Sequence, residues 1–486
     1  MAPARRDDLL VALAALLPLA LFVAREGRIA GAPGFPLDDS WIHLHFARNL
    51  AGGAGFVYNP GTPVAGSTAP LWTLALAAGA AVAGASLETA KTLGVACALG
   101  AALLTRRAAL GFGAPPAVAL VAAVALLWAG PMAWGALSGM EVTLAALLVA
   151  AALLAHARGR LAWSAGWAAL AVLARPEALL LLPFLALARP LTRRRALTFT
   201  LVTLAALAPM ILFSLWTAGT PYPATAAAKV EGGLLGWLGG VREPIARMLL
   251  LRSWEFLREW VGWLWMTHGL VPVLLVPALG LAWARGGSAL GVPALVLLVH
   301  PLGMALLAPY RGPAFQEGRY SIHLLPLVFV ALAAMARKTR PWALAAYLAL
   351  ALVPLVPAAG RYAWAVQNIN AMQVHLGRWV ATHLPQTARI AVNDVGAIAY
   401  FSRREVIDLM GLVTPEIIPY RREGESGVLR YIALTCPDHV IVFPAWFPQL
   451  TARADLLEPV YRVRLERNEV AGAAEMVVYR LRRCAV

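Results

Sequence analysis

The residues best suited to chemistry are two adjacent aspartates, Asp38 and Asp39, which closely follow the first apolar run of the chain. Either carboxylate could cap the helix predicted over residues 40–51, because aspartate accepts hydrogen bonds from the unpaired amides of a helix N-terminus. A cap needs only one of them. A carboxylate beside an apolar wall has a raised pKa, which suits a general base. The pair therefore indicates either capping with solvation or catalysis, with the second acid as an orienter or a metal ligand.

Further polar side chains stand where apolar runs end, and each has a structural explanation beside a functional one. Glu141 begins a predicted span, where a carboxylate favours the helix N-terminus, and otherwise supplies a second acid to a polar cavity. Arg175 and Glu177 flank a proline and either pair with each other or line the same cavity. His43 is another candidate for the cavity wall. It lies two residues from His45, on a different face of the helix, which argues against a shared metal ion.

An anionic leaving group such as a phosphate needs positive charge or a divalent metal ion to hold it. The candidate cations are Arg319, next to Tyr320, and Lys229, which is the one lysine of three expected in an outward loop. Each has a plainer explanation, Arg319 as an interfacial anchor and Lys229 as a solvated or lipid-snorkelling side chain. His323 follows Arg319 by four residues and is expected to line the same wall. A divalent metal stays an open alternative, and no cofactor is certain.

Composition shows what kind of protein must position these residues. Of the 486 residues, 60% are hydrophobic and 14% are charged, and the mean hydropathy is +0.69. Soluble domains are roughly 45–50% apolar and about 25% charged, so the chain is expected to be a polytopic membrane protein. Its net charge of +16 comes from arginines at the ends of apolar runs. That pattern is typical of cytoplasmic loops facing anionic lipid and not of a nucleic-acid groove, so no nucleic-acid partner is expected.

Twelve apolar segments are candidate spans, and the basic loops between them test how they alternate. If every basic loop lies in the cytoplasm, the N-terminus, which carries Arg5 and Arg6, should lie there too. The spans alternate in that way only if residues 68–104 cross the membrane once. Residues 69–85 are therefore expected to dip in from the outer face, which leaves eleven crossings, with the N-terminus inside and the C-terminus outside. The first run is expected to be retained, because no small-residue cleavage site follows it. The segments lie near residues 9–24, 69–85, 90–104, 116–134, 141–156, 161–174, 178–188, 196–217, 260–284, 288–309, 320–336 and 341–359.

The composition changes at Arg361, which predicts a transmembrane domain over residues 1–360 and a small extracytoplasmic α/β domain over residues 361–486. Short β-branched runs predict strands near residues 388–394, 405–409, 439–443, 461–465 and 476–481, and residues 372–385 predict an amphipathic helix. In the first loop, residues 25–68, the helix over residues 40–51 is expected to lie on the membrane surface, anchored by Trp41 and Phe46. The spacing of the three cysteines predicts neither a disulfide nor a zinc site.

The first loop contains DDSWIHLHFARNLAGGAGFVYNPGTPVAGSTAPLW, which resembles the first outer loop of GT-C superfamily glycosyltransferases. It is most similar to the arabinofuranosyltransferase-like branch of bacterial cell-wall assembly. The resemblance implies a polytopic enzyme that uses a polyprenyl-phosphate sugar at the outer membrane face, with Asp38 or Asp39 as the catalytic base. Further matches follow in order: SGMEVTL at 138–144, ARPEALL at 174–180, GTPYPATAAAK at 219–229, EGRYSIHLLP at 317–326, NINAMQVHLGRWV at 368–380 and NDVGAIAYFSRREVIDLMGLVTPEI at 393–417.

Two departures from that family bear on specificity. His43 and His45 stand where hydroxyl or aromatic residues are expected, and TPYPATAAAK is smaller and more apolar than the family's version. The sugar or the acceptor is therefore expected to differ.

The sequence thus predicts an α-helical polytopic membrane protein of GT-C type, with a catalytic transmembrane domain and a small α/β domain outside the cytoplasmic membrane. A single carboxylate that acts as base without a covalent intermediate implies inversion at the anomeric carbon. The expected partners are a polyprenyl-phosphate sugar donor, with a pentofuranose suggested by the family, a glycan or lipid acceptor of the cell envelope, and membrane lipid.

Two other functions compete with this reading. A transporter or flippase of lipid-linked sugars would share the outward cavity, but many transporters show internal repeats and none is visible in this sequence. A scaffold that only binds glycan would need far fewer spans and would leave the acid pair idle.

Overall fold

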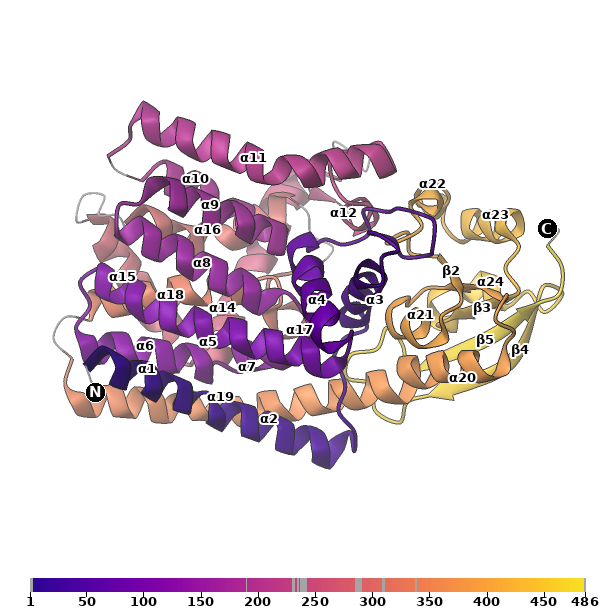
Figure 1. The fold of residues 1–486 in the computed structure, drawn as a ribbon, viewed down its shortest axis with the longest axis horizontal. Coiled ribbons are helices and arrows are strands. Elements are labelled where there is room, and N and C mark those ends of the chain that lie inside the picture. Colours follow the sequence, from indigo (N-terminus) through magenta and orange to yellow (C-terminus); the bar gives the residue numbers. More distant parts are fainter. Residues whose placement is uncertain are drawn as a thin grey trace. The chain divides into compact units, whose positions relative to one another are not determined.

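The computed structural model describes residues 3–188, 190–229, 232–233, 236, 243–284, 291–307, 311–336 and 339–484. The chain divides into two compact units (Figure 1). The first unit consists of Met1–Ala24, Lys91–Pro209 and Lys229–Gly360, and the second of Arg25–Ala90, Met210–Ala228 and Arg361–Val486. Four basic residues of the predicted cytoplasmic loops lie outside the described residues: Arg189, Arg285, Arg337 and Lys338.

The first unit is helical because alanine and leucine, which have high helix propensity, fill its apolar segments. Two helix pairs are bent at short breaks, α6 with α7 by 58° and α14 with α15 by 115°. The helices that lie in this unit or continue past its boundaries are α1 (Pro3–Ala14), α2 (Leu16–Ile29), α5 (Leu87–Gly111), α6 (Pro116–Trp128), α7 (Gly130–Leu137), α8 (Val142–Ala157), α9 (Leu161–Ala174), α10 (Leu181–Ala186), α11 (Arg193–Ala218), α14 (Arg252–Thr267), α15 (Val271–Ala284), α16 (Gly291–Leu307), α17 (Phe315–Gly318), α18 (Leu325–Met335) and α19 (Pro341–Ile369).

Among the described residues, five helices are long and apolar enough to cross a membrane, or up to seven segments if each bent pair crosses once. The predicted eleven crossings would therefore have to include shorter apolar helices such as α8 and α9, and that count stays a prediction. Helix α4 (Pro70–Ala83) has 14 residues. At 1.5 Å per residue it is about 21 Å long, short of the roughly 30 Å hydrocarbon core. Helix α9 also has 14 residues, so length alone does not decide whether residues 69–85 cross, and that stays a prediction.

The start of α1 lies against α5 within the first unit. Arg106 pairs with both Asp7 and Asp8, and its Nη1 lies 3.1 Å from Asp8 Oδ1. Arg107 Nη2 lies 3.0 Å from Asp8 Oδ2. The predicted topology places the N-terminus and the loop after α5 on the same side of the membrane, and these ion pairs are consistent with that prediction.

The second unit is built around a five-stranded sheet of order β2-β1-β3-β5-β4. Strand β1 (Arg389–Val392) runs parallel to β2 (Glu405–Asp408) and β3 (His439–Val442). Strand β5 (Glu475–Leu481) runs antiparallel to β3 and to β4 (Leu457–Arg464). All five predicted strands are therefore confirmed.

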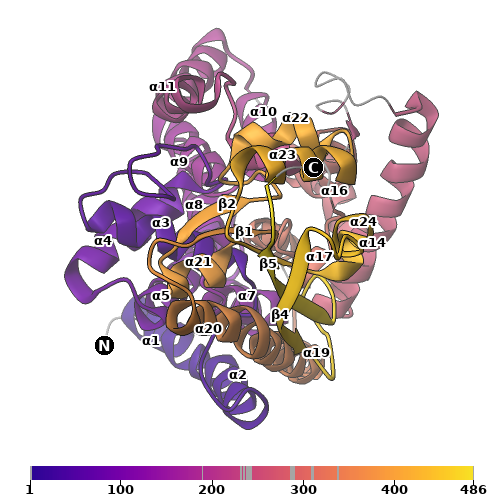
Figure 2. The ribbon, with the colours of Figure 1, turned by 90° about the vertical axis from the view of Figure 1, so that its right-hand side faces the viewer.

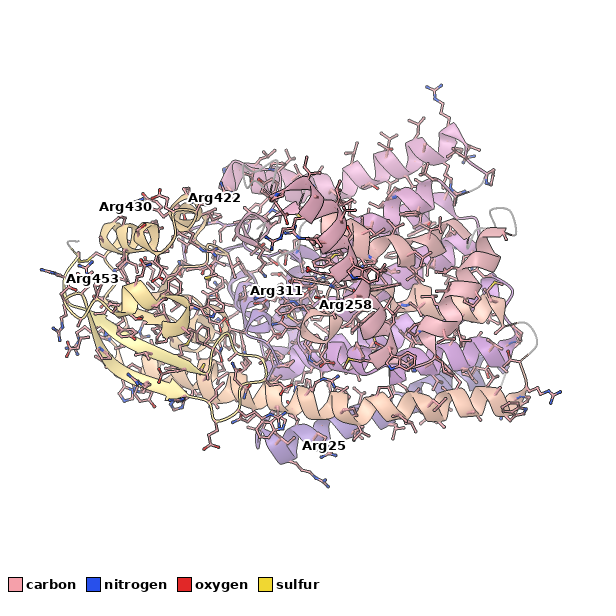
Figure 3. The ribbon with its side chains drawn as sticks, turned by 180° about the vertical axis from the view of Figure 1, so that it is seen from behind. Arg25, Arg258, Arg311, Arg422, Arg430 and Arg453 are labelled. Atoms are coloured by element: carbon pink, nitrogen blue, oxygen red, sulfur yellow. A yellow bond between two sulfur atoms is a disulfide. The ribbon has the colours of Figure 1, made fainter. Side chains whose placement is uncertain are left out.

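Helices cover both faces of the sheet, because apolar side chains alternate between the two sides of each buried strand (Figure 2). One face packs against α20 (His375–His383) and α21 (Gly396–Ser402), and the other against α23 (Glu425–Thr435) and α24 (Pro448–Thr451). The predicted amphipathic helix at residues 372–385 corresponds to α20 and the turn before it. Arg422, just after α22 (Ile418–Arg421), and Arg430 on α23 are exposed at the outside of this layer (Figure 3).

The first loop packs into the second unit through α3 (Asp39–Ala51). Trp41 is 5% exposed and packs edge-on against Phe35 and Phe401, while Phe46 is fully buried and stacks on Phe56. The prediction that Trp41 and Phe46 anchor α3 in the membrane interface was therefore wrong. An apolar stripe on a helix does not show whether lipid or protein will cover it, and here it is protein.

Cys436 and Cys484 form a disulfide, so the prediction that the cysteines form none was wrong. The antiparallel pairing of β3 with β5 places His439 opposite Arg480 and so brings the residues before β3 next to those after β5. The two cysteines are 48 residues apart, and their proximity depends on this pairing rather than on any spacing visible in the sequence. Cys97 on α5 is a half-buried free thiol.

Candidate active site

Asp38 binds the backbone at the start of α21. Its Oδ2 accepts a hydrogen bond from the Gly396 amide at 2.6 Å, and its Oδ1 accepts one from the Ala397 amide at 2.7 Å. Asp38 also precedes α3, but it makes no side-chain capping bond there. It therefore caps a helix 358 residues further along the chain. The approach requires glycine at position 396, because a Cβ atom there would overlap the carbonyl and carboxyl groups of Asp38.

Asp394, between β1 and α21, interacts with the same carboxyl group. Asp38 and Asp394 are hydrogen-bonded to each other, and Gln373 Nε2 donates to Asp394 Oδ2 at 2.6 Å. Burial raises the pKa of Asp38 well above its ordinary value, and the nearby charge of Asp394 raises it further. Burial raises the pKa of Asp394 to about 6. Two carboxyl groups in direct contact disfavour double ionisation, so the pair binds a proton more tightly than isolated aspartates do.

Asp39 lies in a different environment from its neighbour. It is the first residue of α3 and is half-buried, whereas Asp38 is 6% exposed. Both Asp38 oxygens already accept backbone amide hydrogens and the carboxyl group contacts Asp394, so Asp38 is poorly placed to take a proton from a substrate. The geometry favours Asp39 as the candidate base and Asp38 as its structural neighbour, a division that the sequence left open.

The two histidines of α3 connect the first loop internally. His45 donates from Nε2 to the Tyr58 carbonyl at 2.9 Å, and its Nδ1 accepts from Arg48 at 3.1 Å. Burial, with a smaller contribution from the Arg48 charge, lowers the pKa of His45 to about 3, so the ring is neutral. His43 is buried, with Nδ1 3.4 Å from Ser67 Oγ before α4. Its role as a cavity residue stays a prediction.

A second polar group is buried in the first unit around Arg175. The Nε and Nη2 atoms of Arg175 bind the two carboxylate oxygens of Glu177 at 2.9 and 3.0 Å, and Nη1 pairs with Glu141. Of the two alternatives for Arg175 and Glu177, the structure therefore contains the mutual pairing. Glu141 directly precedes α8, as predicted, but its side chain makes no capping hydrogen bond there and pairs with Arg175.

Arg319 lies in the same unit and shares an aromatic neighbour with Arg175. Arg319 Nη2 donates to the Tyr320 hydroxyl at 3.2 Å. The Tyr320 ring lies 5.1 Å from the Arg319 guanidinium and 4.9 Å from that of Arg175, both within cation–π range. Three of the predicted cavity residues, Glu141, Arg175 and Glu177, are thus brought together with the predicted phosphate ligands Arg319 and Tyr320.

His323 is fully buried near this group, with its ring 5.7 Å from that of His300 on α16. Among the described residues, neither ring nitrogen of His323 has a hydrogen-bond partner. Buried polar atoms are nearly always paired, so these nitrogens mark a place for a water molecule or a ligand. Lys229 ends α12 (Ala224–Lys229) and is half-buried, and its predicted phosphate contact stays a prediction.

The backbone before Arg319 adopts an uncommon conformation. Gln316 and Glu317 have φ angles of 49° and 59°, and Gly318 follows at 77°. Non-glycine residues rarely occupy this left-handed region, and such positions cluster at functional sites. A Cβ atom at Gly318 would overlap the indole of Trp263, whose Nε1 donates to the Glu317 carbonyl at 3.0 Å. The EGRY motif is therefore held in a shape that requires glycine at its second position.

Three residues of these groups were not among the sequence candidates: Asp394, Gln373 and His300. Asp394 is the last residue of the strand predicted near residues 388–394. Side chains at the carboxyl end of parallel strands are common site residues, and this is the signal that could have found it. In the described part of the chain, no three His, Cys, Asp or Glu side chains are arranged to hold a metal ion.

Known structures share the fold of this chain. ArnT from Cupriavidus metallidurans, in a crystal structure bound to undecaprenyl phosphate, is similar with a TM-score of 0.57 and 14% identity. The similarity covers 98% of this chain and 99% of that one. The chain has a GT-C fold. This confirms the predicted class, an α-helical membrane protein with a small C-terminal sheet domain.

A second similar structure is the oligosaccharyltransferase of Archaeoglobus fulgidus in complex with Zn and sulfate. Its TM-score is 0.55 at 14% identity, over 89% of this chain and 67% of that one. In sequence comparisons, residues 366–479 match a family described as a domain of unknown function, DUF8728. No curated protein matches the sequence. At these identities the similarity establishes the fold, and the activity is argued from the residues.

Proposed function

We propose that the protein is an inverting glycosyltransferase that moves a sugar from a polyprenyl-phosphate donor to a glycan or lipid acceptor. The observation that carries this proposal is the contrast between the adjacent acids. Asp38 is buried and bonded to two amides, whereas Asp39 is half-buried at the start of α3. ArnT shares the fold and binds undecaprenyl phosphate in its crystal structure, which supports a lipid-linked donor.

Asp39 acts as the general base in this mechanism. The acceptor hydroxyl oxygen attacks the anomeric carbon while Asp39 takes the hydroxyl proton. The bond between that carbon and the phosphate oxygen breaks, and its electron pair leaves with the polyprenyl phosphate. Asp39 then releases the proton to water. A single displacement without a covalent intermediate inverts the anomeric configuration.

Arg319, Tyr320 and His323 bind the donor phosphate, with Lys229 as a second cation. The hydroxyl and ring of Tyr320 orient the Arg319 guanidinium, and His323 offers two buried nitrogens. A guanidinium in a buried site stabilises the charge that develops on a departing phosphate. Arg175 is already bound by two carboxylates, so its part is to set the charge around Tyr320.

The enzyme acts at the outer face of the cytoplasmic membrane, with its N-terminus inside. The disulfide between Cys436 and Cys484 supports an extracytoplasmic position for residues 361–486, because disulfides persist mainly in oxidising compartments. The motif similarity to the arabinofuranosyltransferase-like branch favours a pentofuranose as the sugar and a cell-envelope molecule as the acceptor.

The test is sugar transfer by the purified full-length protein in proteoliposomes. A panel of polyprenyl-phosphoryl pentoses and hexoses is supplied together with cell-envelope glycan and lipid acceptors. The expected result is consumption of one donor and a product of inverted anomeric configuration, read by NMR. Movement of a donor across the bilayer without transfer would support a transporter or flippase instead. Absence of transfer from every donor would contradict the proposal.

A further inference from the structure

The first loop is bonded to the C-terminal segment at several points besides Asp38. The Tyr58 hydroxyl donates to the Val395 carbonyl at 2.8 Å. Asn59 exchanges two hydrogen bonds with Val406 on β2, at 2.8 and 3.0 Å, in the way that a neighbouring strand would. The loop that carries the acid pair is therefore built into the sheet domain and is not merely adjacent to it.

One residue of the sheet domain reaches the acid pair itself. Asp394 binds the Asp38 carboxyl group, and Gln373, in the turn before α20, holds Asp394 in place at 2.6 Å. Asp38 and Gln373 are buried and Asp394 is half-buried, and Asp38 directly precedes Asp39 at the start of α3. A continuous series of contacts therefore runs from Gln373, just before α20, through Asp394 and Asp38 to the first turn of α3.

We propose that Asp394 is a positioning residue, which holds the Asp38 side chain and thereby sets the orientation of Asp39. The segment that matches a domain of unknown function, residues 366–479, then has a defined role: it keeps the first loop in its catalytic conformation. The catalytic part of this inference rests on the proposed function, whereas the positioning is a property of the fold and is measurable by itself.

Two variants of the full-length protein test this role. Asp394→Ala removes the partner of Asp38. Asp394→Asn keeps an oxygen that accepts from Asp38, and Gln373 can turn to present Oε1, which has no hydrogen-bond partner among the described residues. Glu466→Gln, an exposed carboxylate of the same unit, is the matched control. Hydrogen exchange of the peptide covering residues 36–46 reports the order of the loop, and kcat and donor KM report catalysis.

Asp394→Ala should speed exchange in residues 36–46 by about tenfold or more, while Asp394→Asn and the control stay within about threefold of wild type. For sugar transfer, Asp394→Ala should lower kcat by about tenfold or more with little change in donor KM, and asparagine should restore kcat. A loss confined to KM, or no rescue by asparagine, would overturn the positioning role.

Exchange separates this inference from the proposed function. If residues 36–46 of Asp394→Ala exchange at the wild-type rate, the positioning role is overturned, whether or not the protein transfers sugar. Faster exchange in a protein that transfers no sugar from any donor would support positioning while the proposed function fails. If Asp394→Ala does not fold, Gln373→Ala takes its place, because it removes the group that holds Asp394. Unchanged exchange in residues 36–46 of that variant would likewise overturn the inference.

Discussion

Replacing Asp38 should loosen the start of α21 without abolishing the fold of the second unit. Asparagine at this position keeps one oxygen, so one of the two amides at Gly396 and Ala397 loses its acceptor. A buried donor left without a partner costs roughly 1–3 kcal/mol, which corresponds to a roughly 5- to 150-fold larger local opening equilibrium. Alanine removes both acceptors and should cost roughly twice as much.

Hydrogen exchange of the peptide covering residues 395–402 measures this effect directly, because the affected amides lie at its start. Asp39→Asn is the matched control, since it makes the same change one residue away, where the α21 amides are not involved. Asp38→Asn should exchange faster than wild type in this peptide, and Asp39→Asn should not. Equal exchange in all three proteins, or faster exchange in Asp39→Asn, would refute the assignment of Asp38 as the cap of α21.

Three further outcomes are expected. Arg175→Met removes the cation that pairs with the buried Glu141 and the half-buried Glu177, and should cost roughly 3–5 kcal/mol, seen as a lower thermal midpoint. An unchanged midpoint would contradict the triad. Cys436→Ser removes a disulfide that closes a loop of 48 residues, and the greater chain entropy of the unfolded state should lower the free energy of unfolding by about 4 kcal/mol. If the wild-type protein unfolds identically with and without reductant, that result would argue against the disulfide. Asp394 ionises at its ordinary pKa when unfolded but at about 6 when folded, so stability should fall by about 3 kcal/mol as pH rises from about 4 to about 6. Asp394→Asn should show a shallower slope in a pH series of thermal midpoints, because only the raised pKa of Asp38 then remains in the pair.

The class of fold and the strands could be predicted because they depend on local patterns. Long apolar runs require a membrane or a buried helix, and the β-branched runs near residues 388–394 and 439–443 became β1 and β3. The pairing of Arg175 with Glu177 could also be foreseen, since the two residues stand close in sequence on either side of a proline.

The features that the sequence could not supply depend on contacts between distant segments. Asp38 and Asp39 are the same residue type side by side, and only the approach of α21 distinguishes them. Trp41 was expected in the membrane interface because it lies near the first apolar run. The residue that covers it, Phe401, lies far along the chain, so the sequence does not reveal the contact. Cys436 met Cys484 only through the pairing of β3 with β5. Each outcome follows from tertiary packing, which periodicity and spacing do not encode.

The most direct test of the central claim is the kcat for sugar transfer by full-length Asp39→Asn, on the donor that the wild-type protein consumes. If Asp39 is the general base, kcat should fall by roughly 10²- to 10⁴-fold while donor KM and exchange in residues 395–402 stay near wild type. A kcat within about threefold of wild type in a folded Asp39→Asn protein would contradict the assignment of the base.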